Sequence, residues 1–340
     1  MTSITSKEIR LKNRPEGLPA ASDFELAEVT LPAINDGEVL VQNMYMSVDP
    51  YMRPRMYDRK SYFPPFQVGQ PLDGGGVGRV IESKTDGFKE GDYVLSMLGW
   101  REYFVSGEAG LTKIDAKLLP VQAYLGVAGM PGMAAYVGLL HIGELKEGQT
   151  VFVSAAAGAV GSVVCQIAKL KGCYVIGSAG SDEKVAWLVE EAGIDAAFNY
   201  KTTDDVIAEV GRHFPEGIDV YFENVGGVHL EAALEHMRPN GYIVMCGMIS
   251  MYNAVKPVPG PIRLSYVVSK KLTMRGFIVG DHFDKLGAFI SDMGKWMTEG
   301  KIIWKETIVD GIENAPEAFI GLFKGENFGK MIVNVGPDPT

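Results

Sequence analysis

Small residues follow a short apolar run between residues 150 and 161, in the order Thr150-Val-Phe-Val-Ser-Ala-Ala-Ala-Gly-Ala-Val-Gly161. An apolar helical pattern begins directly after Gly161. Such a turn can bind a phosphate, because free N–H groups at a helix start attract an anion and small residues let it approach the backbone. Ala155 stands where the commonest fingerprint has its first glycine, so an ordinary strand-to-helix turn is the alternative. The sequence predicts a pyrophosphate site at Gly158 and Gly161.

The segment after this helix indicates which dinucleotide binds. A second predicted strand, residues 173–177, leads into Ser178, Ala179 and Gly180, where an NAD site usually carries Asp or Glu for the ribose 2′-hydroxyl. Lys184 and Tyr200 follow, and their ammonium and hydroxyl groups could bind a 2′-phosphate there. We therefore predict NADPH rather than NADH. In the alternative reading, Lys184 is a solvated helix residue and Tyr200 only packs.

The elements that must position these residues alternate from about Gly129 onward. Strand patterns separated by helical links are typical of a doubly wound parallel sheet. Six such strands are predicted at residues 150–154, 174–177, 197–199, 218–222, 242–246 and 272–277. This part of the chain, residues 129–309, is predicted to be a Rossmann domain.

The first third of the chain has short β patterns broken by turns, at residues 38–42, 76–82 and 92–96. This spacing predicts a barrel-like β domain. A helical stretch at 315–323 and a last strand at 330–335 are expected to return to that domain. The predicted fold class is therefore α/β, with a discontinuous β-rich domain over residues 1–128 and 310–340.

Composition argues against several function classes. The chain has 340 residues and a formal net charge of −10, and without a basic stripe it is not expected to bind nucleic acid. It lacks an eighteen-residue apolar run and a secretory signal, so no membrane partner is expected and a cytoplasmic location is predicted. The three cysteines fall in apolar segments and the five histidines are scattered, which disfavours disulfides and a metal site.

Several longer motifs occur in order along nearly the whole chain. They are Val48-Asp-Pro-Tyr-Met-Arg53, Gly129-Met-Pro-Gly-Met-Ala-Ala-Tyr136, the 155–161 turn, Tyr221-Phe-Glu-Asn-Val-Gly-Gly227, Cys246-Gly-Met-Ile-Ser-Met-Tyr-Asn253 and Gly325-Glu-Asn-Phe-Gly-Lys330. In combination they resemble the zinc-independent alkenal and enone double-bond reductases of the medium-chain dehydrogenase/reductase superfamily, which include prostaglandin, plant alkenal and bacterial curcumin reductases. The resemblance implies a GroES-like β domain, a Rossmann domain, and NADPH-dependent reduction of an α,β-unsaturated carbonyl.

The resemblance also implies a site without metal. The zinc alcohol dehydrogenases of this superfamily carry a Cys in the segment matching residues 47–49 and a His-Glu pair in that matching 69–71, and neither is present. Their cysteine-rich lobe is missing between Trp100 and Lys117. The carbonyl must then be polarised by hydroxyls or backbone amides rather than by a Lewis acid.

Carried over position by position, the resemblance implies a set of NADPH-binding residues. The pyrophosphate is expected at Gly158, Ala159, Val160 and Gly161, and the 2′-phosphate at Lys184 and Tyr200. The other expected cofactor residues are Met130, Gly180, Asn224, Cys246, Gly247, Met248, Ile249, Ser250, Tyr252, Phe277, Ile278, Val279 and Asn327. For Asn224 and Asn327, simple turn formation is the alternative.

Reduction of an enone needs a hydride for the β-carbon, a stabiliser for the developing enolate and a proton for the α-carbon. Tyr252 is the first candidate stabiliser, because a phenol is protonated at neutral pH and can donate to an enolate. Tyr51, Tyr62 and Tyr266 are further candidates, and each of these tyrosines could instead only form an apolar wall. A ribose hydroxyl of the cofactor and solvent could also serve, leaving no essential side chain.

Methionine and aromatic residues are dense between residues 45 and 63, which predicts either an adaptable apolar wall for medium-chain or aryl enones or simply core packing. Two other functions remain open: an NADPH quinone reductase of the same superfamily, and a non-catalytic NADPH-binding sensor. The strand at 272–277 lies near the predicted sheet edge, so a homodimer is expected.

Overall fold

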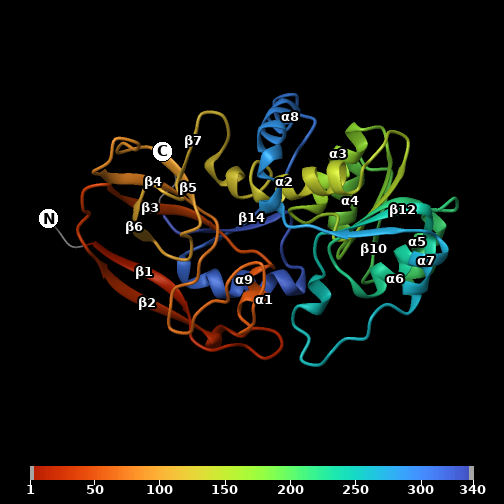
Figure 1. The fold of residues 1–340 in the computed structure, drawn as a ribbon, viewed down its shortest axis with the longest axis horizontal. Coiled ribbons are helices and arrows are strands. Elements are labelled where there is room, and N and C mark those ends of the chain that lie inside the picture. The colour runs from red at the N-terminus through yellow and green to blue at the C-terminus, as the bar shows by residue number, and fades with distance from the viewer. Residues whose placement is uncertain (1–3, 337–340) are drawn as a thin grey trace. The chain divides into compact units, whose positions relative to one another are not determined.

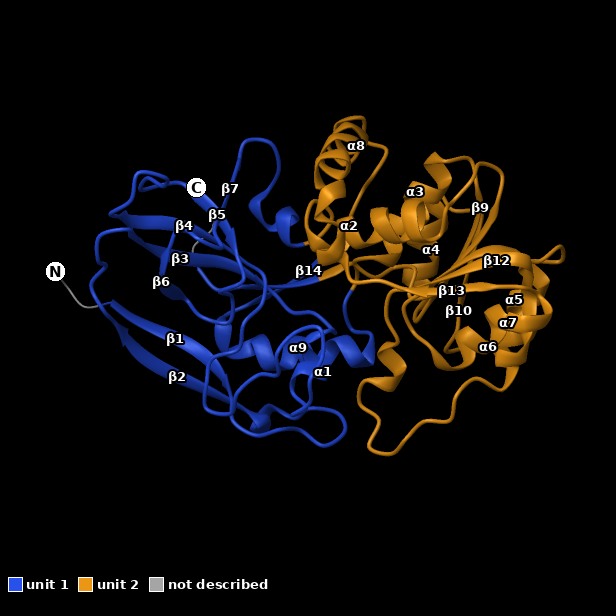
Figure 2. Ribbon diagram, in the orientation of Figure 1, with its two compact units in different colours: residues 1–125, 306–327, 331–340 blue, residues 126–305, 328–330 orange. Residues whose placement is uncertain are grey.

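The chain folds into two units, coloured separately in Figure 2. The computed structural model describes residues 4–336 (Figure 1). Unit 1 contains the described residues up to Leu125, Glu306–Asn327 and those from Met331 onward, while unit 2 contains Gly126–Lys305 and Phe328–Lys330. Each unit has its own sheets and its own core.

Unit 1 is built on antiparallel strands around the long central strand β3 (Glu38–Ser47). Its larger sheet has the order β14 (Glu306–Asp310), β15 (Lys330–Asn334), β3, β4 (Gly76–Ser83), β5 (Tyr93–Ser96) and β7 (Thr112–Ile114), with β6 (Tyr103–Gly107) also paired to β3. A second sheet pairs β1 (Ile4–Leu11) with β2 (Phe24–Leu31). The helices are α1 (Met52–Arg55) and α9 (Ala315–Lys324).

Residues 126–128 were expected in the β domain, but they belong to unit 2. Two further differences lie at residues 306–309 and 328–330. Residues 306–309 were expected in the Rossmann domain, but they belong to β14, which pairs with β15. Residues 328–330 were expected in the β domain, but they belong to unit 2. Both differences arise from long-range pairing, which a local sequence pattern does not report.

Unit 2 is a six-stranded parallel sheet between two layers of helices, as predicted. The strand order is β10 (Ala196–Asn199), β9 (Tyr174–Ala179), β8 (Thr150–Val153), β11 (Ile218–Glu223), β12 (Met237–Met245) and β13 (Thr273–Gly276). Figure 1 shows the helices on the two faces; they are α2 (Met130–Val137), α3 (Gly161–Leu170) and α4 (Asp182–Glu190) on one, and α5 (Val206–His213), α6 (Gly227–His236) and α7 (Tyr266–Ser269) on the other. A further helix, α8 (Leu286–Thr298), packs on α2.

Strand β8 lies at the point where the strand order reverses, between β9 and β11. Ligands of doubly wound sheets bind beyond the carboxyl ends of the strands at this point. The strand is apolar throughout its buried part, since Val151, Phe152 and Val153 are all 0% exposed, as befits a parallel strand covered on both faces. The glycine turn of residues 155–161 follows it directly.

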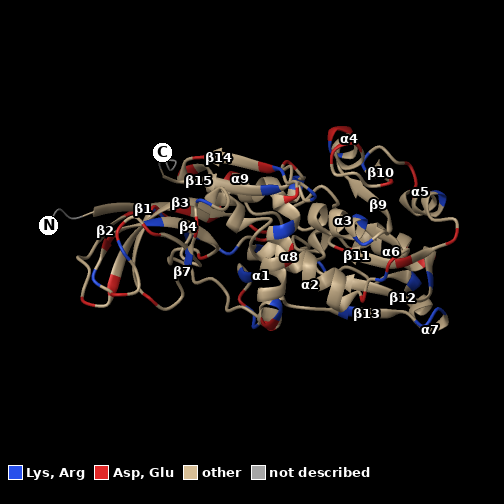
Figure 3. Ribbon diagram, turned by 90° about the horizontal axis from the view of Figure 1, so that it is seen from above, with Lys and Arg blue, Asp and Glu red and all other residues tan. Residues whose placement is uncertain are grey.

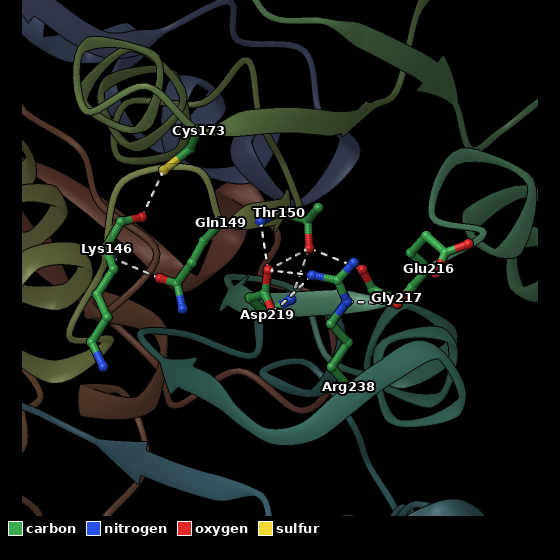
Figure 4. Close-up of polar contacts among 8 residues, drawn as sticks. All are labelled: Lys146, Gln149, Thr150, Cys173, Glu216, Gly217, Asp219 and Arg238. Atoms are coloured by element: carbon green, nitrogen blue, oxygen red, sulfur yellow. Dashed lines mark hydrogen bonds and ion pairs between the residues drawn. The ribbon is translucent and has the colours of Figure 1, made fainter.

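At the opposite end of the same strands, a polar network ties β8 to β11 and β12 (Figure 4). The Asp219 carboxylate accepts hydrogen bonds from the backbone N–H and the hydroxyl of Thr150, at 2.9 and 3.0 Å. Arg238 reaches the same carboxylate oxygen at 3.0 Å. The side chain of Asp219 is 18% exposed, so these contacts are largely shielded from water.

We expect Asp219→Ala to lower the free energy of unfolding by about 2–3 kcal/mol, because it leaves the Thr150 N–H without its acceptor and removes the partly exposed ion pair with Arg238. Thermal denaturation should show that the melting temperature falls by about 5–10 °C. The exposed Asp204 offers a matched control, and Asp204→Ala should leave the melting temperature unchanged. Equal melting temperatures for the two variants would contradict the assignment.

Charged positions are interspersed in both units (Figure 3), although the first turn of α4 is acidic, with Asp182 and Glu183. Among residues 4–336, no helix combines the length and the apolar character needed to cross a membrane.

Candidate cofactor and active site

The turn of residues 155–161, which follows β8, needs small residues at Ala155 and Gly161. Ala155 has a φ of +48°, in the left-handed region that favours glycine, so it takes over the conformation of the missing first glycine. A Cβ on Gly161 would collide with the carbonyl oxygen of Ala155 and lie 2.9 Å from the Cα of Ala156. Gly161 is therefore required for the close approach of helix α3 to the turn.

Backbone donors in this turn are available to an anion. Within residues 4–336, the N–H groups of Ala159 and Val160 take part in no backbone hydrogen bond. No side chain caps helix α3, whose N-cap residue is Val160. Unpaired donors at a helix start, with the positive end of the helix dipole, form an anion site. The turn therefore fits the pyrophosphate of a dinucleotide.

Polar side chains lie close to Gly180, the residue directly after β9. A Cβ at Gly180 would lie 3.1 Å from the Tyr200 hydroxyl oxygen and 3.3 Å from Cε of Lys201. Burial lowers the pKa of Lys184, and the neighbouring charge of Lys201 lowers it further. Two ammonium groups and a phenol thus lie close together, an arrangement that a bound phosphate dianion would stabilise.

Lys201 is a member of this group that the sequence analysis missed. It directly follows Tyr200, and the sequence analysis carried over only the tyrosine. Residue order alone did not show that both side chains return to Gly180 and Lys184, because that requires β10 to pair beside β9. The complete donor set, with Ser178 to Gly180 offering no carboxylate, fits a 2′-phosphate rather than a free ribose hydroxyl.

His229 on α6 supports Tyr200 from within the core. The two rings meet edge to face, with centroids 5.1 Å apart and planes at 80°. The imidazole is 2% exposed, and neither ring nitrogen has a hydrogen-bond partner among the described residues. Burial lowers its pKa to about 4. The histidine is therefore neutral in the folded protein at neutral pH.

This histidine should make the protein sensitive to acid. Between pH 6.5 and 4 the unfolded chain binds a proton at His229 that the folded chain does not, so stability falls as pH decreases through this range, by up to about 3 kcal/mol. His229→Phe keeps the ring contact and should remove that part of the slope in urea denaturation at pH 7, 6 and 5. The same substitution at the more exposed His282 should not. Parallel slopes for wild type and His229→Phe would argue against this.

The loops after β11 and β12 are joined to each other and to the end of β8. The N–H groups of Cys246 and Gly247 both donate to the carbonyl of Glu223 at 3.0 Å, and Ile249 N–H donates to the carbonyl of Asn224 at 3.2 Å. The Asn224 side chain donates to the Ser154 carbonyl at 2.8 Å. Asn224 therefore does more than form a turn, since it fixes the expected cofactor loop against β8.

Glu223 is a further residue of this site that the sequence analysis did not single out. Its side chain is 0% exposed, and Oε1 accepts hydrogen bonds from the N–H groups of Val225 and Gly226 at 2.6 and 2.8 Å. Ser154 donates to the same oxygen at 3.1 Å. Burial raises the pKa of the Glu223 carboxyl. The buried Glu223 carboxylate therefore fixes the backbone of the loop that follows β11.

Tyr252 makes a hydrogen bond within the loop of residues 246–252. Its hydroxyl oxygen accepts the Met248 N–H at 3.2 Å, and burial raises the pKa of the phenol. A Cβ on Gly247 would lie 3.2 Å from that oxygen, so the hydroxyl lies directly over the glycine. The phenol is thus held, protonated, at the carboxyl edge of the sheet.

Tyr266, by contrast, is not brought to this loop. Lys270 Nζ lies 4.8 Å from the centre of the Tyr266 ring and donates to the carbonyls of Leu234 and Glu235, which are the last turn of α6. Because α6 starts beside the carboxyl end of β11 and runs back, its last turn lies at the other edge of the sheet. Tyr266 therefore lies near the last turn of α6, apart from Tyr252, and its catalytic role stays a prediction.

The remaining expected cofactor residues of unit 2 lie on α2 and after β13. Met130 begins α2 and is 39% exposed. Phe277, Ile278 and Val279 follow β13, and the Phe277 ring lies so close to Gly138 that a Cβ there would be 2.8 Å from it. Gly138 directly follows the end of α2, so these segments pack together.

Unit 1 brings Tyr51 and Tyr62 together around Phe63. The Phe63 ring lies 5.8 Å from that of Tyr51 and 5.3 Å from that of Tyr62. The Tyr51 hydroxyl is buried without a hydrogen-bond partner among the described residues, and burial followed by the charge of Asp49 raises its pKa. Tyr62 is 53% exposed. Tyr51 thus presents a protonated phenol, and Tyr62 an accessible one.

The structure answers, for part of the methionine and aromatic cluster at residues 45–63, whether it forms a substrate wall or packs in the core. The residues with side chains in the core are Tyr45, Met46, Met52 and Met56, all at most 5% exposed. They pack with other buried residues of unit 1. The later part, with Tyr51, Tyr57, Tyr62 and Phe63, is at least partly exposed.

Asn327 belongs to unit 1 and immediately precedes the three residues that belong to unit 2. Within residues 4–336, no group of three or more His, Cys, Asp or Glu side chains is arranged to hold a metal ion. The residues present do not fit the zinc of the metal-dependent dehydrogenases.

Comparison with known proteins places these features in context. Residues 7–114 match the family model of an N-terminal domain of oxidoreductase, and residues 159–293 match that of zinc-binding dehydrogenase. The chain is 46% identical to prostaglandin reductase 1 of Bos taurus over 97% of this chain and 99% of the relative. It is 44% identical to the NADP(+)-dependent 2-alkenal reductase of Nicotiana tabacum, over 98% of each. The crystal structure of CurA from Vibrio vulnificus in complex with NADPH superposes with a TM-score of 0.92, at 42% identity, covering 97% of this chain and 99% of that one.

Proposed function

Since the chain belongs to the alkenal, prostaglandin and curcumin reductase family of the medium-chain dehydrogenase/reductase superfamily, we propose roles for its residues in the reaction of that family. The protein is an NADPH-dependent oxidoreductase that reduces the C=C bond of α,β-unsaturated aldehydes and ketones. The observation that supports NADPH for this chain is that Tyr200 and Lys201 lie beside Gly180, at a strand end without a carboxylate, with Lys184 near enough to Lys201 for their charges to interact.

The phosphates of NADPH would be held by two groups of residues in unit 2. The N–H groups of Ala159 and Val160, at the start of α3, bind the pyrophosphate. Lys184, Tyr200 and Lys201 bind the 2′-phosphate. The loop of residues 246–252, together with Asn224, lines the nicotinamide side. Met130, residues 277–279 and Asn327 complete the set.

When bound, NADPH supplies the hydride that adds to the β-carbon of the substrate. Negative charge then develops on the carbonyl oxygen, and the Tyr252 hydroxyl stabilises it by donating a hydrogen bond. Tyr51 and Tyr62 of unit 1 are the alternative donors. The α-carbon receives its proton from solvent or from one of these hydroxyls.

The fully described sheet edge at β13 supports a homodimer. Strand β13 pairs with β12 on one side and with no other described strand. Val268 and Ile262, in the segment that leads to it, are 81% and 87% exposed, which is unusual for large apolar side chains. Light scattering should give twice the chain mass for the wild type, and the chain mass for Ile262→Asp with Val268→Asp. The cytosol is the proposed compartment, where Cys165, Cys173 and Cys246 remain free thiols.

The function is tested by NADPH oxidation, with NADH in parallel, against alkenals, aryl enones and quinones, with the products identified by mass spectrometry. Saturated aldehydes or ketones formed with NADPH are expected. Hydroquinones as the sole products would instead indicate a quinone reductase, and NADPH binding without turnover would indicate a sensor.

A further inference from the structure

Three residues near the end of the described chain, Phe328–Lys330, belong to unit 2, although the segments on either side belong to unit 1. We call these residues the strap. The chain thus enters the Rossmann unit for three residues only and leaves it again. So short an excursion must be held by specific contacts.

The strap is bonded to the turn that binds the pyrophosphate. Gly329 N–H donates to the carbonyl of Ala157 at 2.9 Å, and Gly158 and Gly329 form an isolated parallel bridge. On the other side, Lys330 N–H donates to the carbonyl of Lys305 at 3.0 Å. Ala157 lies two residues before Ala159, whose N–H is one of the donors available to the anion. The strap therefore fixes Ala157 and Gly158, the residues directly before the anion-binding N–H groups.

Gly329 is required for this contact. Its φ is +62°, in the left-handed region, and a Cβ would collide with the carbonyl of Lys305. Any side chain at this position would force the strap away from Lys305 or from the turn.

The strap also contacts the helix that carries Lys184. The Phe328 ring meets the Trp187 ring edge to face, with centroids 5.3 Å apart and planes at 90°. Trp187 is 4% exposed and lies one helical turn after Lys184 on α4. Phe328 and Gly329 thus touch both phosphate-binding elements, the turn and α4.

We propose that the strap is a positioning element for NADPH binding, in which Phe328 and Gly329 keep the glycine turn and α4 in their binding arrangement. The inference rests on the proposed NADPH site. If a loosened strap lets the turn leave that arrangement, the apparent Kd rises by the inverse of the fraction that remains competent. Chemistry at saturating cofactor is then unaffected.

The test uses the full chain with Phe328→Ala, and measures the Kd for NADPH and for NADH by nicotinamide fluorescence together with kcat at saturating cofactor. We expect both Kd values to rise about three- to tenfold, the range of one lost aromatic pair, and kcat to stay within about twofold. Phe328→Tyr retains the ring and should restore both Kd values.

Tyr174→Ala is the matched control, because it removes another edge-to-face pair of unit 2, with Phe214, at the start of β9 and away from the turn. It should lower the melting temperature without changing either Kd. Unchanged Kd values in Phe328→Ala, with a melting temperature lowered as in the control, would overturn the proposal. If Gly329→Ala folds, it should raise both Kd values more than Phe328→Ala; if it does not, Phe328→Ala alone decides. Absence of NADPH binding by the wild type would refute the cofactor site itself, which is a distinguishable result.

Discussion

Lys184→Ala should raise the KM for NADPH by about a hundredfold and leave the KM for NADH within about threefold. Truncating one partner of a shielded charge pair costs about 2–5 kcal/mol, and each 1.4 kcal/mol is a factor of ten. Lys184 is half-buried, and burial and the nearby charge of Lys201 lower the pKa of its amine. The 2′-phosphate of NADPH, which NADH lacks, would offset that repulsion, so the effect should be specific for NADPH.

Lys201→Ala should act in the same direction but more weakly, since Lys201 is exposed. The double variant should come close to equal use of the two nucleotides. Lys117→Ala, an exposed lysine of unit 1, is the control and should change neither KM. A loss of the same size for NADPH and NADH in Lys184→Ala would mean that this lysine supports the fold or the pyrophosphate, not the 2′-phosphate.

Tyr252→Phe should lower kcat by about ten- to a thousandfold, which is the range observed when one oxyanion donor is removed. The KM for NADPH should change little, because Tyr252→Phe keeps the ring in the loop and removes only the hydroxyl that accepts the Met248 N–H. Burial raises the pKa of Tyr252, so the phenol keeps its proton across neutral pH and the rate should show no titration of this group there. Steady-state kinetics on an aryl enone would measure these effects.

Tyr266→Phe is the control for this substitution, since Tyr266 lies beside the last turn of α6. Tyr51→Phe examines the alternative donor in unit 1, whose hydroxyl is buried without a partner among the described residues. A normal kcat for Tyr252→Phe with a low kcat for Tyr51→Phe would transfer the role to Tyr51. Normal rates for both would indicate that the cofactor ribose and solvent suffice.

Local signals in the sequence predicted the Rossmann unit well. An unbroken apolar run followed by small residues defines β8 and its turn, because a covered parallel strand and a tight turn each impose a strict composition. Ala155 shows the limit of such a pattern, since alanine adopts the left-handed conformation that the fingerprint reserves for glycine. The last strand, β15, was also predicted, but β14, which has the same length, was not.

What the sequence did not reveal depends on pairing between distant segments. Lys201 joins Lys184 only because β10 lies beside β9, and Phe328 meets Trp187 only because the chain returns to unit 2. Tyr266 resembled Tyr252 as a phenol near a glycine- and proline-rich loop, yet the loop carries it toward the last turn of α6. The methionines at 46, 52 and 56 are core because β3 and α1 turn them inward, which composition alone does not show.

The position of β15 has a consequence for biosynthesis. This strand lies between β14 and β3, and Ile332 pairs with Ser47, which leaves the ribosome about 280 residues earlier. At about 5–20 residues per second, residues 45–47 of β3 stay without their β15 partner for tens of seconds, and this unpaired part of the edge can associate with other chains. The Rossmann strands, by contrast, are all made before β15. The nascent chain therefore has a complete nucleotide-binding sheet while its first domain is still unfinished, and a ribosome that stops before Lys330 releases a protein with an open β edge.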